Sequence, residues 1–260
     1  MHEHHGSGTD SAGQPWAGRS FGETAFAGDD GSAPPELVAA IEHFRSGDVE
    51  ISAVVDAIRG ARLLIPLVAH LGESGVNDRG VTVDKSAELS IVTVAGPDGR
   101  NVLPVFASVD AMQHWNPSAR PVPADGVRVA LAAADEGTDL VVLDPTSPTE
   151  CAIRRPALWA IAQSKAWSPS FADPDVLAEF RGSVTDEAAV VDVSLRAGDP
   201  LALLRGPELV VELSLVAGLD QQAIASLLQR LQSRWSESAP IAARVDSMTV
   251  KLLPAGRVTR

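Results

Sequence analysis

Apolar and polar residues follow regular patterns over most of the chain after residue 35, and the clearest stretch covers residues 88–145. Alternating or continuous apolar runs there predict strands, and Ser108 is a good N-cap for a short helix ending at Trp115. An alanine-rich run predicts a longer helix. The expected elements are a strand at 89–94, a turn at 96–99, a strand at 102–107, helices at 109–115 and 127–134, and a strand at 140–143.

Before this stretch, the pattern predicts a helix that starts at a proline pair and ends near Gly47, and a second helix capped by Asp48. An apolar strand over residues 62–68 follows. It contains Pro66, which has no N–H for a ladder bond, so we expect an edge or bulged strand there.

After this stretch, the pattern indicates a second packed unit. Its clearest helix is expected to begin after Asp220 and to bury apolar residues at helical spacing. Helices near 156–161 and 174–180 and strands at 188–195, 209–216 and 248–253 complete the expectation. The predicted fold class is α/β with mixed sheets, in two packed units preceded by a poorly structured arm that carries aromatic residues. The expected divisions are residues 1–33, 34–165 and 170–260.

Composition narrows the function classes. The chain has 260 residues, 45% of them apolar, and a net charge of −13, which fits a globular protein and disfavours binding to nucleic acid. No apolar run is long enough to span a bilayer, and no basic and apolar leader is evident. We therefore expect a cytoplasmic protein without membrane insertion.

The first 35 residues are rich in Gly, Ser and Asp and have no periodicity, yet they contain Trp16, Phe21 and Phe26. Large aromatic residues are unusual in a free tail, so these side chains are expected to dock. They lie either against the chain itself or against a partner.

Candidate catalytic chemistry is sparse. The sequence contains no phosphate-binding loop, nucleophile elbow or zinc-protease motif. Ser108, His114 and Asp144 remain as candidates for an enzyme of unrecognised type, and the single Cys151 is either a structural thiol or a nucleophile. His2, His4 and His5 could bind a metal ion weakly. We expect no enzymatic activity and no cofactor.

Several of these residues carry a resemblance to a known family. They are the proline-containing strand at 64–66, the strand 103–106, Trp115, and the strand that ends in Asp144-Pro145. With the alanine-rich helix they resemble the SseB-type N-terminal domain, especially its actinobacterial members, over about Ile51 to Ala162. The family usually has asparagine where this chain has Asp144. The resemblance implies an α/β domain, and the family takes its name from a secreted component of a type III translocon.

The favoured hypothesis is a non-enzymatic protein-interaction or regulatory module with an unknown protein partner. A structural protein linked to secretion and an enzyme of unrecognised class are the alternatives, and a homo-oligomer is possible. The predicted partner-binding residues are Trp16, Arg19, Phe21, Phe26 and Trp115.

Overall fold

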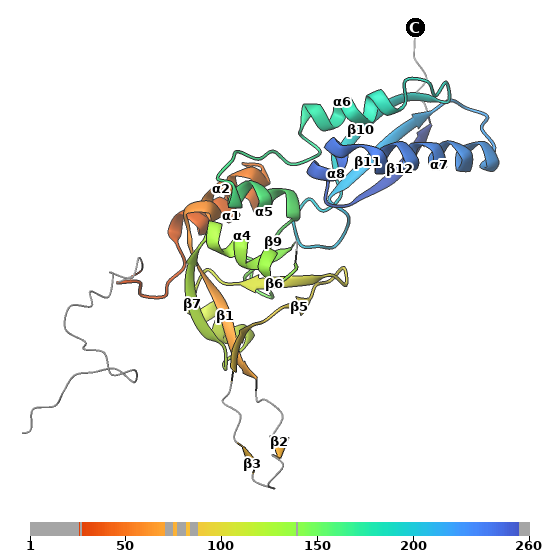
Figure 1. Cartoon of the computed structure of the whole chain (residues 1–260). Coiled ribbons are helices and arrows are strands. Elements are labelled where there is room, and N and C mark those ends of the chain that lie inside the picture. The colour runs from red at the N-terminus through yellow and green to blue at the C-terminus, as the bar shows by residue number, and fades with distance from the viewer. Residues whose placement is uncertain are drawn as a thin grey trace, which may run out of the picture. The chain divides into compact units, whose positions relative to one another are not determined.

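The computed structural model describes residues 26, 28–70, 75–76, 82–83, 88–138 and 140–254. The chain divides into two compact units, Met1–Asp30 and Gly31–Arg260. Every helix and strand named below lies in the second unit (Figure 1). The predicted arm falls mostly outside the described residues.

Two helices open the second unit. Helix α1 (Pro35–Ser46) begins with a proline in its first turn and ends at Gly47, whose φ of 81° suits a glycine. Helix α2 (Ile51–Gly60) follows, with Glu50 at its N-cap. The prediction that Asp48 caps α2 is wrong. Its carboxylate instead accepts a hydrogen bond from Ser46 Oγ at 2.8 Å, back toward α1.

Strand β1 (Arg62–His70) is the middle strand of a sheet, between β4 (Glu88–Ile91) and β7 (Arg120–Asp125). The prediction of an edge or bulged strand is therefore wrong, since the pairing with β7 also runs through Pro66 without a shift in register. Pro66 is tolerated because it lies opposite Pro121 of β7, and pairing with β4 starts only at the next residue. At this position of the sheet, therefore, no neighbouring strand needs a backbone N–H donor from residue 66.

A second, mixed sheet consists of β5 (Val94–Ala95), β6 (Asn101–Val105), β8 (Val141–Leu143) and β9 (Cys151–Ile153), in that order. The pairing of Leu64 with Phe106 links it to β1. The predicted strand 89–94 is divided, since β4 pairs with β1 while β5 forms a hairpin with β6. Strands β6 and β8 are parallel, which requires the long connection through two helices and β7. The two helices are α3 (Val109–Trp115) and α4 (Gly126–Asp135). Two short strands, β2 (Gly75–Val76) and β3 (Thr82–Val83), pair with each other.

Helices α1, α2, α4 and α5 (Arg155–Ala162) cover these sheets and share one hydrophobic core with them (Figure 1). The predicted cap at Ser108 is confirmed, since its Oγ accepts a hydrogen bond from the Ala111 N–H at 3.1 Å. Asp125 caps α4 in the same way, through the Arg128 N–H at 2.8 Å.

The rest of the unit forms a three-stranded sheet with a hydrophobic core of its own, in the order β10-β11-β12. Leu209, Val211 and Leu213 of β11 are fully buried on the face that the helices cover. On the other face, Glu212 lies between Arg196 and Lys251, with both ion pairs at 3.1 Å. The elements are α6 (Pro174–Ser183), β10 (Val190–Ala197), β11 (Leu209–Leu215), α7 (Gln221–Glu237), α8 (Ala239–Arg244) and β12 (Met248–Pro254).

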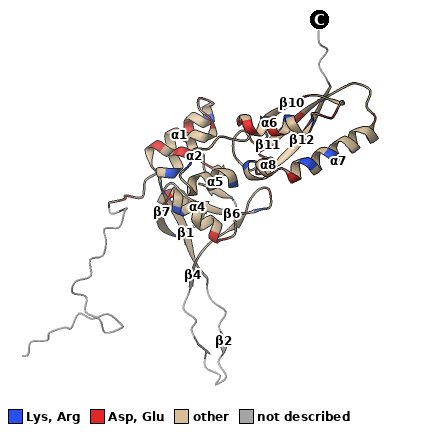
Figure 2. Cartoon of the chain, turned by 45° about the horizontal axis from the view of Figure 1, so that its top comes forward, with Lys and Arg blue, Asp and Glu red and all other residues tan. Residues whose placement is uncertain are grey.

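This architecture confirms the predicted α/β class, because helices pack against β-sheet in each of the two hydrophobic cores. Acidic and basic residues are interspersed along the helices (Figure 2). None of the described helices is long and apolar enough to cross a membrane.

Candidate functional site

A cavity of about 250 Å³ lies where the first core meets the segments that lead into and out of the second sheet. Its wall combines aromatic rings, small apolar residues and three carboxylates. The residues are Phe44, Gly47, Val49–Ile51, Val55, Ala152–Arg154, Ala157, Trp167, Pro169, Phe171, Ala197, Asp199, Pro200, Ala202 and Glu208. A concave, largely apolar wall with a few polar groups is the usual form of a binding site.

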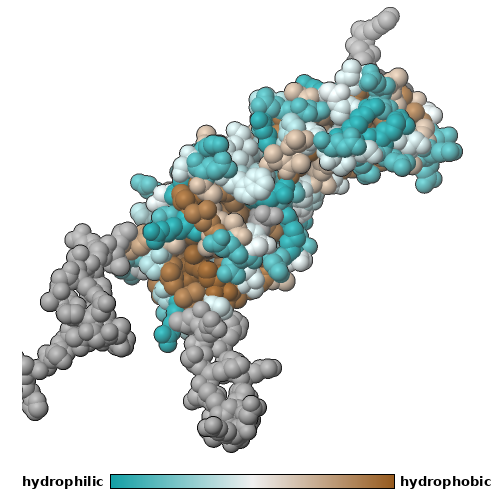
Figure 3. Space-filling view, in the orientation of Figure 1, coloured by the Kyte–Doolittle hydropathy of each residue, from teal (hydrophilic) through white to brown (hydrophobic). Residues whose placement is uncertain are grey.

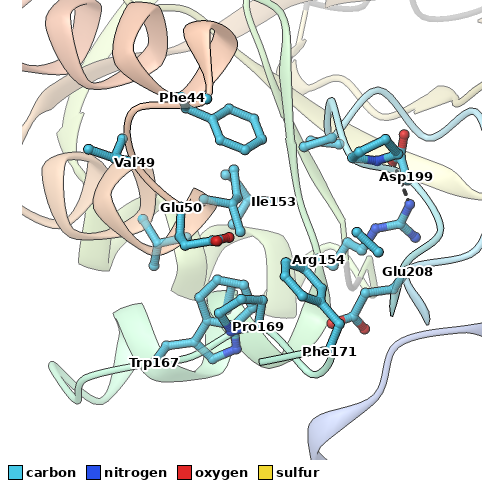
Figure 4. A pocket seen from close by; sticks show the side chains of 18 residues that line it. Phe44, Val49, Glu50, Ile153, Arg154, Trp167, Pro169, Phe171, Asp199 and Glu208 are labelled. Atoms are coloured by element: carbon cyan, nitrogen blue, oxygen red, sulfur yellow. Dashed lines mark hydrogen bonds and ion pairs between the residues drawn. The ribbon is translucent and has the colours of Figure 1, made fainter. Parts of the chain in front are cut away.

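Three aromatic rings line the cavity from different elements (Figure 4). Phe44 projects from the last turn of α1, and Trp167 and Phe171 come from the connection between α5 and α6. Both Phe44 and Trp167 also pack against the first core, and Phe171 packs against the second. Packing on both sides therefore fixes the aromatic wall.

The polar end of the cavity belongs to a buried network of ion pairs. The guanidinium of Arg154, which is 8% exposed, lies 2.7 Å from the Asp199 carboxylate and 2.9 Å from that of Asp246. Arg100 adds two hydrogen bonds to Asp246, at 3.0 and 2.9 Å. Burial acts to raise the pKa of Asp246, but the hydrogen bonds from the two arginines hold it below its usual value.

Glu208 is a second buried carboxylate at this end. It accepts hydrogen bonds from Ser170 Oγ at 2.8 Å and from the Asp246 N–H at 2.6 Å. Burial nevertheless raises the pKa of Glu208 above its usual value. The network thus combines one carboxyl group that stays charged with one that holds its proton more readily.

The loop between β10 and β11 forms the floor of this arrangement. Asp199 accepts from the Leu203 and Leu204 N–H groups at 3.1 and 2.8 Å, which folds the loop back on itself. The Ala152 N–H donates to the Ala202 carbonyl at 2.7 Å, so the loop continues the sheet beyond β9. Arg45 of α1 also donates to the Leu201 carbonyl.

Glu50 lies at the mouth of the cavity and differs from the other carboxylates. Its side chain is exposed and makes no capping bond to α2, although Glu50 occupies the N-cap position. Its carboxylate points into the cavity (Figure 4). Among the described residues, none donates a hydrogen bond to it or forms an ion pair with it.

Of the predicted partner-binding residues, Trp115 belongs to the same compact unit as this cavity, and it does not line it. Trp16, Arg19 and Phe21 lie outside the described residues. Phe26 is half-buried, and its carbonyl accepts from the Asp29 N–H at 3.1 Å.

Trp115 does line a cavity, although a different one. Its ring packs 5.3 Å from that of Phe106, and it borders an apolar cavity of about 460 Å³ between β5, β6 and the loop after β8. Apolar side chains also gather on the surface over β1 and β7 (Figure 3).

The three candidate catalytic residues, which the structure describes, form no hydrogen bonds with one another, and the bonds that Ser108 and Asp144 accept have structural roles. Ser108 caps α3, and His114 is exposed in the last turn of that helix. Asp144 is buried and accepts from the Ala107 N–H and from Thr149 Oγ1, both at 2.7 Å. Within this described trio, no hydrogen bond joins the imidazole to the hydroxyl or the carboxylate.

Cys151 is fully buried in β9, and burial raises its pKa to about 12. A thiol of that kind is a poor nucleophile at neutral pH. In the described part of the chain no three His, Cys, Asp or Glu side chains are grouped to hold a metal ion, and His2, His4 and His5 fall outside it.

The residues that the sequence did not reveal are Arg154, Asp199, Glu208 and Asp246. In the sequence, Arg154 is the first residue of an Arg-Arg pair, and Asp199 stands between Gly198 and Pro200, as a turn residue often does. One signal was present: Arg154 directly follows a short apolar strand, where a charged side chain requires a partner if it is buried. Its partners could not be found, because they lie 45 and 92 positions away.

The part of the chain from α1 to α5 folds as an α/β domain with mixed sheets covered by helices. Residues 37–160 match the family model described as SseB protein N-terminal domain, so this part of the chain is an SseB-type N-terminal domain. The match begins within α1, earlier than the motif residues indicated. No curated protein and no solved structure matches the chain.

Proposed function

We propose that this protein is a non-enzymatic interaction module of the cytoplasm, and that the cavity between α1, α5 and the β10–β11 loop is its recognition site. The observation that carries the proposal is the aromatic wall beside an ion-pair network whose members bind one another. Aromatic residues in a concave, packed setting are typical of recognition sites.

The buried charged groups at the polar end of the cavity support binding over catalysis. A general acid or base needs a proton-accepting or proton-donating position free to face the substrate. Arg154 and Asp199 are instead engaged with each other, and Glu208 accepts two hydrogen bonds from the protein. Their arrangement serves to hold the loop and the aromatic wall in place.

The test uses a substitution that fills the cavity without removing a buried contact. Val49 lines the cavity and is 37% exposed, so Val49→Trp should block the mouth and leave both cores intact. Val122→Trp is the matched control, because Val122 is 38% exposed on β7 and does not line this cavity.

Affinity recovery of the tagged full chain from its own cells, with quantitative mass spectrometry, compares the two variants with the wild type. The proposal expects one or more proteins recovered with the wild type and the Val122 variant and lost with Val49→Trp. Equal recovery with both variants, at unchanged melting temperature, would contradict it.

A further inference from the structure

We infer that the cavity binds an organic cation, namely a protonated amine or a guanidinium group on a short apolar stem. This inference rests on the proposed function, since it names the chemistry that the recognition site selects. Three features of the cavity carry it: the balance of charge, the unpartnered carboxylate at its mouth, and the aromatic wall.

Charge around the cavity is unbalanced toward the negative. Among the described residues that line the cavity, three carry carboxyl groups, Glu50, Asp199 and Glu208, against the one guanidinium group of Arg154. A cation entering the cavity therefore meets a favourable field in a partly desolvated setting.

Arg154, the one cationic residue among the described residues of the cavity wall, has no terminal N–H left to offer an anion. Its Nη1 donates to Asp246 at 2.9 Å and to Ser247 Oγ at 3.2 Å. Its Nη2 donates to Asp199 at 2.7 Å and to the Gly206 carbonyl at 2.9 Å. An anionic ligand would have to displace these bonds, so the site selects against negative charge.

Glu50 supplies the acceptor for the cation. Its carboxylate points into the cavity from the start of α2 and has no partner among the described residues (Figure 4). A charged hydrogen bond from an ammonium or guanidinium group would satisfy it without disturbing any existing contact.

The aromatic wall completes the match. Phe44, Trp167 and Phe171 surround the space that the Glu50 carboxylate faces (Figure 4). The Arg45 guanidinium already lies over the Phe44 ring, 5.6 Å from its centroid, so the cation contact is assigned to Trp167 and Phe171, and all three rings can pack against an alkyl stem. A volume of about 250 Å³ is below that of most sites for drug-sized ligands, which are roughly 300–1,000 Å³. The occupant is thus a small amine or the end of a single lysine or arginine side chain.

The test is a titration of the full chain followed by ligand-observed NMR. The free probes are n-butylammonium and n-butylguanidinium, with 1-butanol and butyrate as the neutral and anionic analogues. A second arm uses acetyl-Ala-Lys-Ala-amide beside the same peptide with norleucine in place of lysine. Saturable binding of the cations alone is expected, and tighter binding of the lysine peptide would identify a partner chain as the source.

Two matched variants locate the site. Glu50→Gln should weaken cation binding about tenfold or more, since it removes a charged acceptor. Glu42→Gln removes the same charge from an exposed position on α1 that does not line the cavity, and should leave binding unchanged. Equal binding of the neutral analogues, equal effects of the two variants, or no cation binding would each overturn the inference.

These outcomes are separable from the proposed function. If Val49→Trp abolishes recovery of a partner while no cation binds, the interaction module stands and its cation selectivity is wrong. If cations bind in a Glu50-dependent way while partner recovery ignores Val49→Trp, the ligand chemistry stands and recognition of a protein at this site is wrong.

Discussion

At the scale of single residues, Asp144 shows how a buried acid can serve the backbone. Its φ of 45° lies in the left-handed region, which aspartate and asparagine tolerate better than most residues. Both carboxylate oxygens are occupied, by the Ala107 N–H and the Thr149 hydroxyl. Burial raises the pKa of Asp144 above its usual value, so the charged form is less favoured here than it is in water.

Asp144→Asn should consequently be tolerated. An amide can accept from the Ala107 N–H and lacks the buried charge. A raised folded-state pKa means that wild-type stability falls as the pH rises from the unfolded value, about 3.9, through the folded value. Over that window the free energy of unfolding of Asp144→Asn should rise relative to the wild type, as measured by urea titrations at several pH values.

Asp144→Ala is the comparison. It leaves the buried Ala107 N–H without an acceptor and should lose about 2 kcal/mol or more of stability at neutral pH. Equal losses for the asparagine and alanine variants would contradict the role assigned to the side-chain oxygen.

Asp246 is predicted to have the opposite pH dependence. Because the two arginines hold its pKa below the usual value, its contribution to stability is present above the unfolded pKa of about 3.9. That contribution is lost as the pH falls through the folded value. Asp246→Asn should cost roughly 3–5 kcal/mol at neutral pH, since it unbalances a buried network, and the difference from the wild type should shrink below about pH 4.

Asp192→Asn is the control for this charge change, because Asp192 is exposed and lies 3.7 Å from Arg181. Its effect on the free energy of unfolding should stay within about 1 kcal/mol. A cost at Asp246 no larger than that at Asp192 would show that the network contributes little.

At the scale of elements, two glycines permit the shape of the β10–β11 loop. A Cβ on Gly198 would lie 2.3 Å from the Pro207 carbonyl oxygen, and one on Gly206 would lie 2.8 Å from that of Gly198. The two ends of the loop therefore touch backbone to backbone, which leaves the intervening residues free to reach β9 and Arg154.

Gly198→Ala should force the ends of this loop apart and lower the melting temperature by several degrees. Gly182→Ala is a useful contrast, since no atom lies within 4 Å of a Cβ there and Gly182 is in α6. An alanine in that helix should be neutral or slightly stabilising. Calorimetry of both variants decides, and similar melting temperatures would argue against the close approach.

The elements that the sequence predicts well are those with local causes. Asp220 caps α7 through the Ala223 N–H at 2.7 Å, and Ser108 caps α3, because a cap depends on residues three positions away. Strand β7 was not predicted, because its two prolines are atypical of a strand, although it pairs with β1. Helix α8 was missed as well, since it is short and follows α7 directly.

The candidate site could not be predicted from the sequence, for a related reason. Its parts come from α1, β9, the α5–α6 connection and the β10–β11 loop, and only tertiary packing brings them together. In the sequence, Trp167 and Asp199 each stand near a proline in a segment between expected elements, and ordinary loops contain the same pattern. Trp115 was predicted to bind a partner, and it borders the other cavity.

At the scale of the whole second unit, two hydrophobic cores share one buried ion-pair network. Arg100 and Arg154 belong to the segment that carries the SseB-type domain, and Asp199 and Asp246 to the segment that carries β10–β12. Such a network is a weak source of net stability but fixes geometry, because each charge demands its own partner. The cavity depends on that geometry.

The central claim is that this cavity recognises a partner, and photo-crosslinking in living cells tests it most directly. A small aliphatic diazirine amino acid, close to valine in size, faces the cavity at position 49 without blocking it, and the same amino acid at position 122 provides an equally exposed reference on β7. The account predicts a discrete crosslinked adduct from position 49, lost when Glu50→Gln is combined with it, and none from position 122. No adduct from position 49, or the same adducts from both positions, would contradict it.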